Sequence, residues 1–210
     1  MKVVALGRYP VKSVRGEELP ELAFGPRGAR HDRWWALRTP EGRFGSGKTT
    51  RRFVRLPRLP EMSARMVGDE AELTLPDGRA FPVSDPGLAA LVSEVVGRPV
   101  EIAPEGAVRH HDEHPVHVVT TASLRWLGVD WRTVRANVVV DAPGADRVED
   151  AWAGRRFTAG DAEFEVVGPA TRCVMVGAAA LKALAGHDLT FGVYAKVLRP
   201  GVVGLSSPWG

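Results

Sequence analysis

Short strand-like runs separated by turn residues are the strongest constraint that this sequence places on its fold. Apolar and β-branched residues cluster in brief runs, and Pro, Gly or Asp follows several of them. Helical patterns are fewer, at 86–96, 122–127 and 178–185. Closely spaced strands favour a barrel or a sandwich over repeated βαβ units, so we predict a mostly β fold. The predicted strands are 3–9, 33–38, 61–67, 71–75, 100–103, 116–120, 137–141, 163–168, 173–176 and 191–198.

Length and composition set the size of the core and the class of protein. A chain of 210 residues with 44% hydrophobic content can bury one large core or two small ones. No apolar run approaches the length of a membrane span, and the N-terminus has no signal-peptide core. We therefore expect a soluble, cytoplasmic protein with no membrane partner.

Positive charge is concentrated near the N-terminus. Residues 8–58 contain 11 Arg and two Lys against five acidic residues, a net charge of +8, whereas the whole chain carries +3. Guanidinium groups in such a segment suit a phosphate-bearing ligand or a nucleic acid. High genomic GC content also enriches arginine without any functional meaning, so both interpretations stay open.

Residues 42–49 (GRFGSGKT) match the P-loop pattern of nucleotide-binding proteins. That loop works only between a strand and a helix, whose N-terminus helps to hold the phosphates. Here Pro57 and Pro60 would break a following helix, and residues 40–42 (PEG) resemble a hairpin turn. We therefore predict that the motif is not a nucleotide site, although Lys48 could touch an anionic ligand.

Four histidines, at positions 110, 111, 114 and 117, form a second candidate motif. Imidazoles at this spacing can bind zinc, but Pro115 interrupts any helix that would align them. A strand after the segment would place alternate residues on opposite faces. A polar loop is the favoured interpretation, with a zinc site as the alternative.

Cys173 is the only cysteine, so the chain cannot form an internal disulfide or a cysteine-based zinc site. It follows a strand-like run and Arg172, which would favour a thiolate. Cys173 is therefore either a small buried hydrophobic residue or a thiolate that acts as nucleophile or metal ligand.

Several short segments, in order, resemble the MOSC-domain proteins, in particular the mitochondrial amidoxime-reducing component and its bacterial relatives. No single segment is specific, but the ordered set covers nearly the whole chain. The segments are YPVKSVRG (9–16), RHDRWWAL (30–37) followed by EG (41–42), DEHP (112–115) leading to TTASL (120–124), RANVVV (135–140), EDAW (149–152), TRC (171–173), FGVY (191–194) and RPG (199–201).

The resemblance implies a β-barrel MOSC domain packed with an N-terminal β-rich region. We place the N-terminal region at 1–108 and the MOSC domain at 109–210. It also implies the molybdenum cofactor, Mo-molybdopterin, in which molybdenum is bound by a pterin dithiolene and a protein cysteine. Cys173 is the counterpart of that cysteine, as metal ligand and catalytic residue, and a soft anionic thiolate suits a redox-active metal.

Other roles are carried over from the same resemblance. Asp112 matches an acidic residue near the family's metal and could relay protons. The cofactor's phosphate would be bound by residues that match family contacts in both regions. These are Lys12, Ser13 and Arg33 in the N-terminal region, Arg135, Asn137, Thr171 and Arg172 in the MOSC domain, and Thr120 and Thr121 as weaker matches.

The sequence also departs from the family pattern. Ala136 replaces a proline, residues 45–48 (GSGK) replace the Thr-Ala-Arg of mitochondrial relatives, and Thr190 stands where many bacterial relatives have Asn. Residues 203–210 lack the Gly-Asp that customarily follows the final strand. One cysteine cannot hold an iron–sulfur cluster, so electrons would come from a separate flavin, haem or iron–sulfur protein.

We therefore predict a molybdenum-dependent oxidoreductase that reduces small N-hydroxylated compounds and binds no nucleic acid. The alternative is a non-catalytic module that binds molybdopterin or carries sulfur. A third hypothesis, nucleotide or nucleic-acid binding through the basic segment, would show salt-sensitive affinity.

Overall fold

Four β-sheets confirm the prediction of a mostly β protein. The computed structural model describes the whole chain, Met1–Gly210. Its contacts divide the chain into two compact units. Unit 1 contains residues 1–7, 18–30 and 113–210, and unit 2 contains residues 8–17 and 31–112. The predicted domain boundary after residue 108 stays a prediction.

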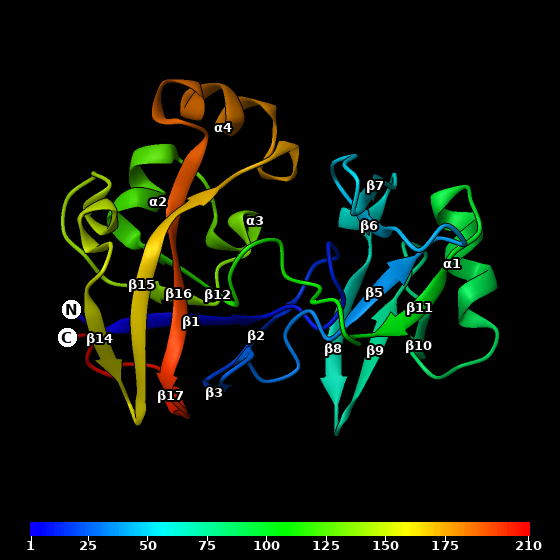
Figure 1. Cartoon of the computed structure of the whole chain (residues 1–210), viewed down its shortest axis with the longest axis horizontal. Helices are drawn as coiled ribbons and strands as arrows, with labels where there is room; N and C mark the ends of the chain where they lie inside the picture. Colours follow the sequence, from blue (N-terminus) through cyan, green and yellow to red (C-terminus); the bar gives the residue numbers. More distant parts are fainter. The chain divides into compact units, whose positions relative to one another are not determined.

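Unit 1 is built on a curled, seven-stranded sheet (Figure 1). Its two longest strands, β15 and β16, form an antiparallel pair, whereas β12 and β13 run parallel. In spatial order the strands are β14 (Arg156–Ala159), β15 (Ala162–Thr171), β16 (Thr190–Arg199), β12 (Val116–Thr120), β13 (Val138–Val140), β1 (Val3–Arg8) and β2 (Glu17–Glu18).

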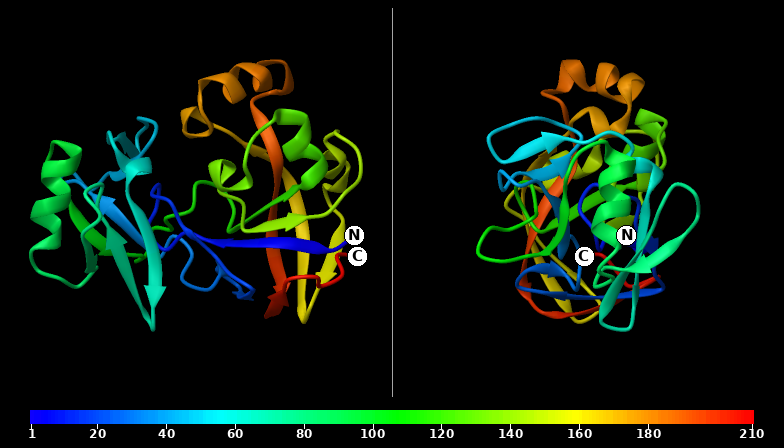
Figure 2. Two further views of the ribbon diagram at one scale, coloured as in Figure 1. Left: turned by 180° about the vertical axis from the view of Figure 1, so that it is seen from behind. Right: turned by 90° about the vertical axis from the view of Figure 1, so that its right-hand side faces the viewer.

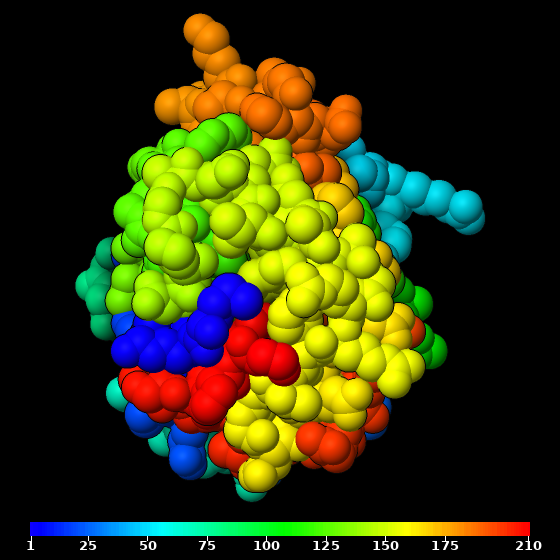
Figure 3. Space-filling model, turned by 90° about the vertical axis from the view of Figure 1, so that its left-hand side faces the viewer, coloured from blue at the N-terminus to red at the C-terminus, as the bar shows by residue number.

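A second sheet of unit 1 joins β17 (Gly201–Gly204), β3 (Glu21–Gly25) and β4 (Gly28–Ala29). The two chain ends lie side by side, as the blue and red segments of Figure 3 show. The amide of Val3 donates to the carbonyl of Ser207 at 2.9 Å. Trp209 is thereby buried against the core of the large sheet, with its ring 5.5 Å from that of Phe164.

The helices of unit 1 are short, as expected from the scarcity of helical patterns. The predicted segments 122–127 and 178–185 correspond to α2 (Thr121–Leu127) and to α4 (Ala178–Ala183) with the 3₁₀ turn η4 (Leu184–His187). Additional helical segments are α3 (Trp131–Val134), η2 (Val148–Trp152) and η3 (Val174–Val176).

The predicted strand at 173–176 is wrong, because this segment contains η3 instead. The last sheet-like bond of this segment is donated by the amide of Arg172 to the carbonyl of Leu189, at 2.7 Å. The chain then turns, and Val176 packs with Val134 and Leu184 in a core cluster. Burial of this valine outweighs the strand propensity of its neighbours.

Unit 2 contains two small sheets and one longer helix. One sheet has the order β11 (Glu101–Pro104), β5 (Trp35–Arg38), β6 (Phe44–Ser46) and β7 (Phe53–Arg55), and the other β10 (Ala80–Pro82), β9 (Glu70–Thr74) and β8 (Ser63–Val67). A 3₁₀ turn, η1 (Leu59–Glu61), precedes β8.

Helix α1 (Leu88–Val96) covers the core of unit 2 and confirms the predicted helix at 86–96 (Figure 2). Leu88, Val92 and Val96 recur at the spacing of one helix face and are all buried. They pack in one cluster with apolar side chains of the strands, such as Leu37 and Leu73.

Candidate functional site

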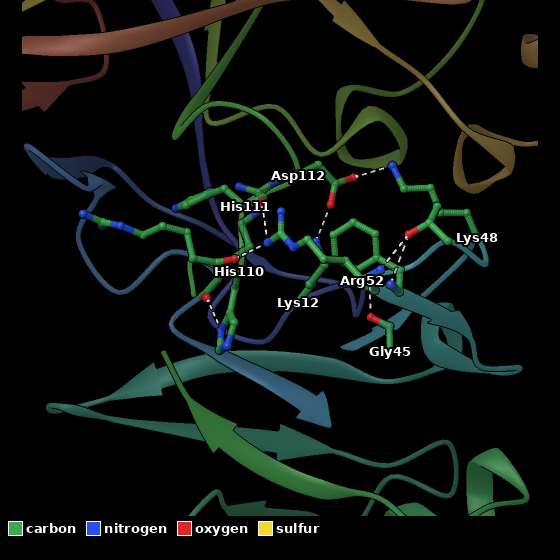
Figure 4. Close-up of polar contacts among 12 residues, drawn as sticks. Lys12, Gly45, Lys48, Arg52, His110, His111 and Asp112 are labelled. Atoms are coloured by element: carbon green, nitrogen blue, oxygen red, sulfur yellow. Dashed lines mark hydrogen bonds and ion pairs between the residues drawn. The ribbon is translucent and has the colours of Figure 1, made fainter. Parts of the chain in front are cut away.

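Polar residues from distant positions of unit 2 converge on Asp112 (Figure 4). One carboxylate oxygen accepts from the Lys12 ammonium at 2.5 Å and the other from Lys48 at 3.2 Å. Lys12 lies in the segment after β1 and is buried, whereas Lys48 follows β6 and is partly exposed. Because these residues are far apart in the sequence, no local sequence pattern predicts that they cluster.

Three cationic side chains lie near the ring of Phe53. The Lys12 and Lys48 ammonium nitrogens lie 4.6 and 5.3 Å from its centroid, and the Arg52 guanidinium lies at 4.9 Å. An aromatic face attracts cations at such distances. Asp112 pairs with the two lysines and not with Arg52, so the three cations and this carboxylate leave an excess of positive charge that suits an anionic ligand.

The two lysines determine the charge state of Asp112. Burial by itself would raise the pKa of this carboxyl group, but the Lys12 ammonium, followed by Lys48, outweighs burial and holds the pKa well below its usual range. Asp112 is therefore ionised at neutral pH. Its role as a proton relay stays a prediction, and the geometry favours an electrostatic role.

Arg33 belongs to a second polar group in unit 2. Its guanidinium forms an ion pair with the buried Asp32 and lies 4.8 Å from the ring of Tyr9. Asp32 also accepts from the amide of Tyr9 at 2.8 Å. These contacts hold the segment around Arg33, whose backbone has a φ of 50°.

His111 lies among these charges. Burial lowers its pKa from 6.5 to about 4, and Arg33 and Lys12 act in the same direction, while Asp32 opposes them. The imidazole is therefore neutral at pH 7. No pattern in the sequence distinguished His111 from the neighbouring histidines.

Ser13 directly follows Lys12, and both residues lie in a turn of the chain. Its backbone has a φ of 68°, and its hydroxyl donates to the carbonyl of Gly45 at 3.3 Å. This bond connects the start of unit 2 with β6. Lys12, Ser13 and Arg33, which the resemblance grouped as phosphate contacts, thus all lie in unit 2.

Cys173 lies in unit 1, where β15 ends, and is neither fully buried nor fully exposed. The preceding Arg172 is fixed by three hydrogen bonds: to the carbonyls of Ala170 and Val134, at 3.2 and 3.1 Å, and to the hydroxyl of Tyr194, at 3.1 Å. These bonds hold the Arg172 side chain against the backbone of residues 134 and 170 and against Tyr194.

The bond from Arg172 to Val134 also brings two predicted residues together, because Arg135 follows Val134 and caps α3 with a φ of 60°. Helix α3 contacts η3, the turn that follows Cys173. Thr171 is exposed at the end of β15. Arg135, Thr171, Arg172 and Cys173 therefore belong to one region of unit 1.

Three other predicted residues make structural hydrogen bonds. Thr120 caps α2 and donates to the buried Glu149 at 2.6 Å. Thr121 donates to Asp141 at 3.1 Å and exchanges bonds with the backbone of residue 142. Asn137 is buried. Its Oδ1 accepts from the amide of His117 and its Nδ2 donates to the carbonyl of Gly7, each at 3.1 Å. Their cofactor contacts stay predictions.

The P-loop interpretation fails in the structure, as the sequence context indicated. Residues 44–46 of the motif form β6, which pairs with β5 and β7, and the next element after Thr49 is the strand β7 rather than a helix. The hydroxyl of Thr49 accepts from the amide of Arg55 at 3.1 Å, and Lys48 pairs with Asp112. The segment thus lacks the loop-to-helix junction that holds nucleotide phosphates.

The histidine segment gives no metal centre either. No group of three or more His, Cys, Asp or Glu side chains could hold a metal ion. His110 contacts the carbonyl of Arg33 at 3.0 Å in unit 2, whereas the rings of His114 and His117 lie 5.8 and 6.0 Å from that of Tyr194 in unit 1.

None of the helices combines the length and the apolar character that crossing a membrane requires.

Each unit, taken by itself, offers donors of a kind that a phosphate-bearing metal cofactor uses. Cys173 offers one soft sulfur ligand, which leaves the other metal ligands to the cofactor itself. In unit 2, Lys12 and Lys48 offer cationic donors of the kind that bind phosphate. Sequence analysis missed Arg52 and Phe53, and the basic segment around them was the only signal.

Comparisons with known proteins agree with these features. The MOSC N-terminal beta barrel domain matches residues 1–93, and the MOSC domain matches residues 105–206. A search of curated proteins found no match. Among solved structures, the YuaD protein from Bacillus subtilis is similar at 13% identity and a TM-score of 0.50, over 98% of this chain and 92% of that one. YiiM from Geobacillus stearothermophilus matches 46% of this chain and 53% of its own length at 18% identity, with a TM-score of 0.37.

Proposed function

Because the chain belongs to the family of MOSC-domain proteins, we propose that it is a molybdenum-cofactor-dependent oxidoreductase that reduces N-hydroxylated compounds. The MOSC family is linked to molybdenum-cofactor sulfurase-like proteins, and MOSC domains are associated with cofactor binding. The reaction type and the electron donor are the parts that this proposal adds.

The observation that carries the proposal is the position of Cys173. It is the only cysteine, it lies just after the end of β15, and the residue is partly exposed. The preceding Arg172 is fixed by hydrogen bonds to the backbone and to Tyr194, which orders the segment that carries the cysteine. In this proposal Cys173 ligates the metal as a thiolate.

Basic side chains would bind the cofactor's phosphate. Lys12, Arg33 and Ser13 are candidates in unit 2, and Arg135 and Arg172 are candidates in unit 1. When bound, the cofactor supplies a two-electron redox centre. Asp112, ionised and held by Lys12 and Lys48, would keep both ammonium groups in place.

The proposed reaction also requires a source of electrons and protons. Reducing an N–OH group to N–H breaks the N–O bond, consumes two electrons and two protons, and releases water. A separate donor protein with flavin, haem or an iron–sulfur cluster would supply the electrons, because one cysteine cannot hold such a cluster.

The test uses the full chain made in a host that synthesises the molybdenum cofactor. Molybdenum, pterin and the reduction of an aryl amidoxime by a reduced viologen dye are measured per folded molecule. Cys173→Ser is expected to keep the fold and the pterin, but to lower turnover by on the order of a hundredfold or more, because a neutral hydroxyl is a poor ligand for the metal.

Val174→Ala is the matched control, since Val174 adjoins Cys173 and is 53% exposed. It should retain turnover. Undiminished turnover in Cys173→Ser would contradict the ligand assignment. Wild-type protein that contains pterin but never turns over would instead favour a cofactor-binding or sulfur-carrying module.

A further inference from the structure

Unit 2 contains a pocket of ≈ 920 Å³ that the proposed function does not use. Its walls come from three parts of the chain: the turn before β6, the turn before β7, and the segment that follows β11. This volume lies in the range of small-molecule sites, about 300–1,000 Å³. All of its lining residues belong to unit 2.

Positive charge dominates the pocket wall. Four arginines line it, Arg38, Arg43, Arg51 and Arg52, against one carboxylate, that of Glu41. Arg38 is paired with a glutamate of β11 outside the pocket wall. The side chains of Arg43 and Arg51 make no hydrogen bond and no ion pair, so both guanidinium groups can bind a ligand.

Arg52 is held in place before any ligand binds. Its Nη2 donates to the carbonyls of Arg109 and His111, the latter at 3.3 Å, and its guanidinium lies 4.9 Å from the ring of Phe53 (Figure 4). Its Nε–H is buried and has no acceptor. A buried donor without an acceptor is costly, and a ligand oxygen would satisfy it.

The rest of the lining is apolar. Phe44, Phe53 and Ala103 are largely buried and contribute to the wall, and Val108 is 53% exposed beside them. Single exposed valines are common on protein surfaces, but this one adjoins a basic pocket. The pocket thus combines oxyanion donors with a surface for an apolar group.

We propose that this pocket binds a small organic oxyanion, in which a carboxylate or phosphate group contacts the arginines and an aromatic or aliphatic body lies on the apolar wall. Arg43, Arg51 and Arg52 supply charge-assisted hydrogen bonds. The pocket's residues lie within one unit, so this binding requires neither the molybdenum cofactor nor the reaction proposed above.

The test is a fluorescence titration of the full chain with 1-anilinonaphthalene-8-sulfonate, which joins an oxyanion to an aromatic body. We expect one saturable site, displaced by an aryl carboxylate or an aryl phosphate. Uncharged N-phenyl-1-naphthylamine is expected to bind at least about tenfold more weakly, because it lacks the charged acceptor. If one aryl anion displaces the probe much better than the other, that ratio identifies the anion that the pocket prefers.

The double variant Arg43→Gln, Arg51→Gln should weaken sulfonate binding about tenfold or more, since it removes two charged donors. It should fold normally, because neither side chain has a partner to lose. The matched control is Arg55→Gln, Arg58→Gln, which removes the same charge from exposed residues of the same basic segment outside the pocket. The control should change affinity less than about twofold.

Three results would overturn the proposal. These are the absence of a saturable sulfonate site, equal loss of affinity in the two double variants, and equal binding of the charged and uncharged probes. Equal loss would indicate general attraction to the basic surface, and equal probe binding would indicate apolar contact alone.

Discussion

Lys12 and Asp112, which lie 100 positions apart in the sequence, form an ion pair of 2.5 Å. The pair joins the segment after β1 to the last residue of unit 2. Lys48 shares the same carboxylate at 3.2 Å. A single acidic side chain therefore connects three parts of unit 2.

Replacing Asp112 with Asn should destabilise the protein by about 1–3 kcal/mol at pH 7, because two lysines lose their shared carboxylate. The pKa of Asp112 is lowered in the folded state, so its contribution is present above the unfolded pKa and is lost as pH falls toward the folded pKa. The difference between wild type and variant, measured by urea unfolding, should therefore shrink as pH falls below about 4.

Glu113→Gln is the control for that experiment. Glu113 is the adjacent residue and is exposed, and none of the hydrogen bonds or ion pairs of the chain involves its side chain. It should change the free energy of unfolding by less than about 0.5 kcal/mol. Equal effects of the two variants at pH 7 would contradict a specific role of the Asp112 pair.

His111 should make stability depend on pH in a different window. Burial lowers its pKa to about 4 in the folded protein, whereas the unfolded chain titrates near 6.5. Between these values the unfolded state binds a proton that the folded state does not, so stability should fall as pH is lowered from about 6.5 to about 4. His111→Gln should flatten that part of the curve. The same slope in wild type and variant would refute the assignment, and the imidazole's own titration can be followed by NMR.

Glu149 should be important for the fold of unit 1. It is fully buried and accepts hydrogen bonds from the hydroxyls of Thr120 and Ser123, at 2.6 and 2.7 Å, at the start of α2. Glu149→Ala should cost about 2–4 kcal/mol, because it leaves the buried Thr120 hydroxyl without its acceptor and Ser123 with only the Asp146 carbonyl at 3.3 Å. Thermal unfolding measures this cost. Glu163→Gln is the control. Glu163 forms an ion pair of 3.7 Å with the exposed Arg199, and its replacement should cost less than about 1 kcal/mol.

Trp209 should anchor the C-terminal segment. Its ring is 1% exposed and stacks on Phe157 and Phe164, with centroids 5.4 and 5.5 Å away. Trp209→Ala should lower stability by about 3–5 kcal/mol through the cavity it leaves. Leu205→Ala, at a side chain that is 45% exposed, should cost less than about 1 kcal/mol in the same chemical denaturation assay. Similar costs at the two positions would show that the stacked rings contribute little.

Local sequence signals predicted most of the secondary structure. Apolar runs bounded by turn residues identified strands such as 116–120 and 191–198, and the spacing of Leu88, Val92 and Val96 identified α1. These patterns depend on neighbours within a few residues, which is why they can be read from the chain alone. The segment 173–176 was mispredicted because the burial of Val176 against distant residues decided its conformation.

The candidate site was only partly accessible to the same reasoning. Cys173 stood out as the only cysteine, and the ordered motifs indicated the family and a set of basic residues. The contacts of Lys48 and Arg52 did not stand out, since Lys48 lay inside a misleading P-loop pattern and Arg52 was one of many arginines. Their significance comes from the pairing of Lys48 with Asp112 and from the bonds of Arg52 to the carbonyls of Arg109 and His111, groups that only folding brings near them.

The sequence by itself therefore determined the mostly β class, the family and the identity of the one possible cysteine ligand, because these depend on composition, local spacing and ordered motifs. The tertiary structure alone decided that Asp112 pairs with both Lys12 and Lys48, that His111 is neutral, and that the Thr120 hydroxyl donates to Glu149. Charge states and hydrogen-bond partners depend on burial and on groups far apart in the chain, and both are set only when the chain has folded.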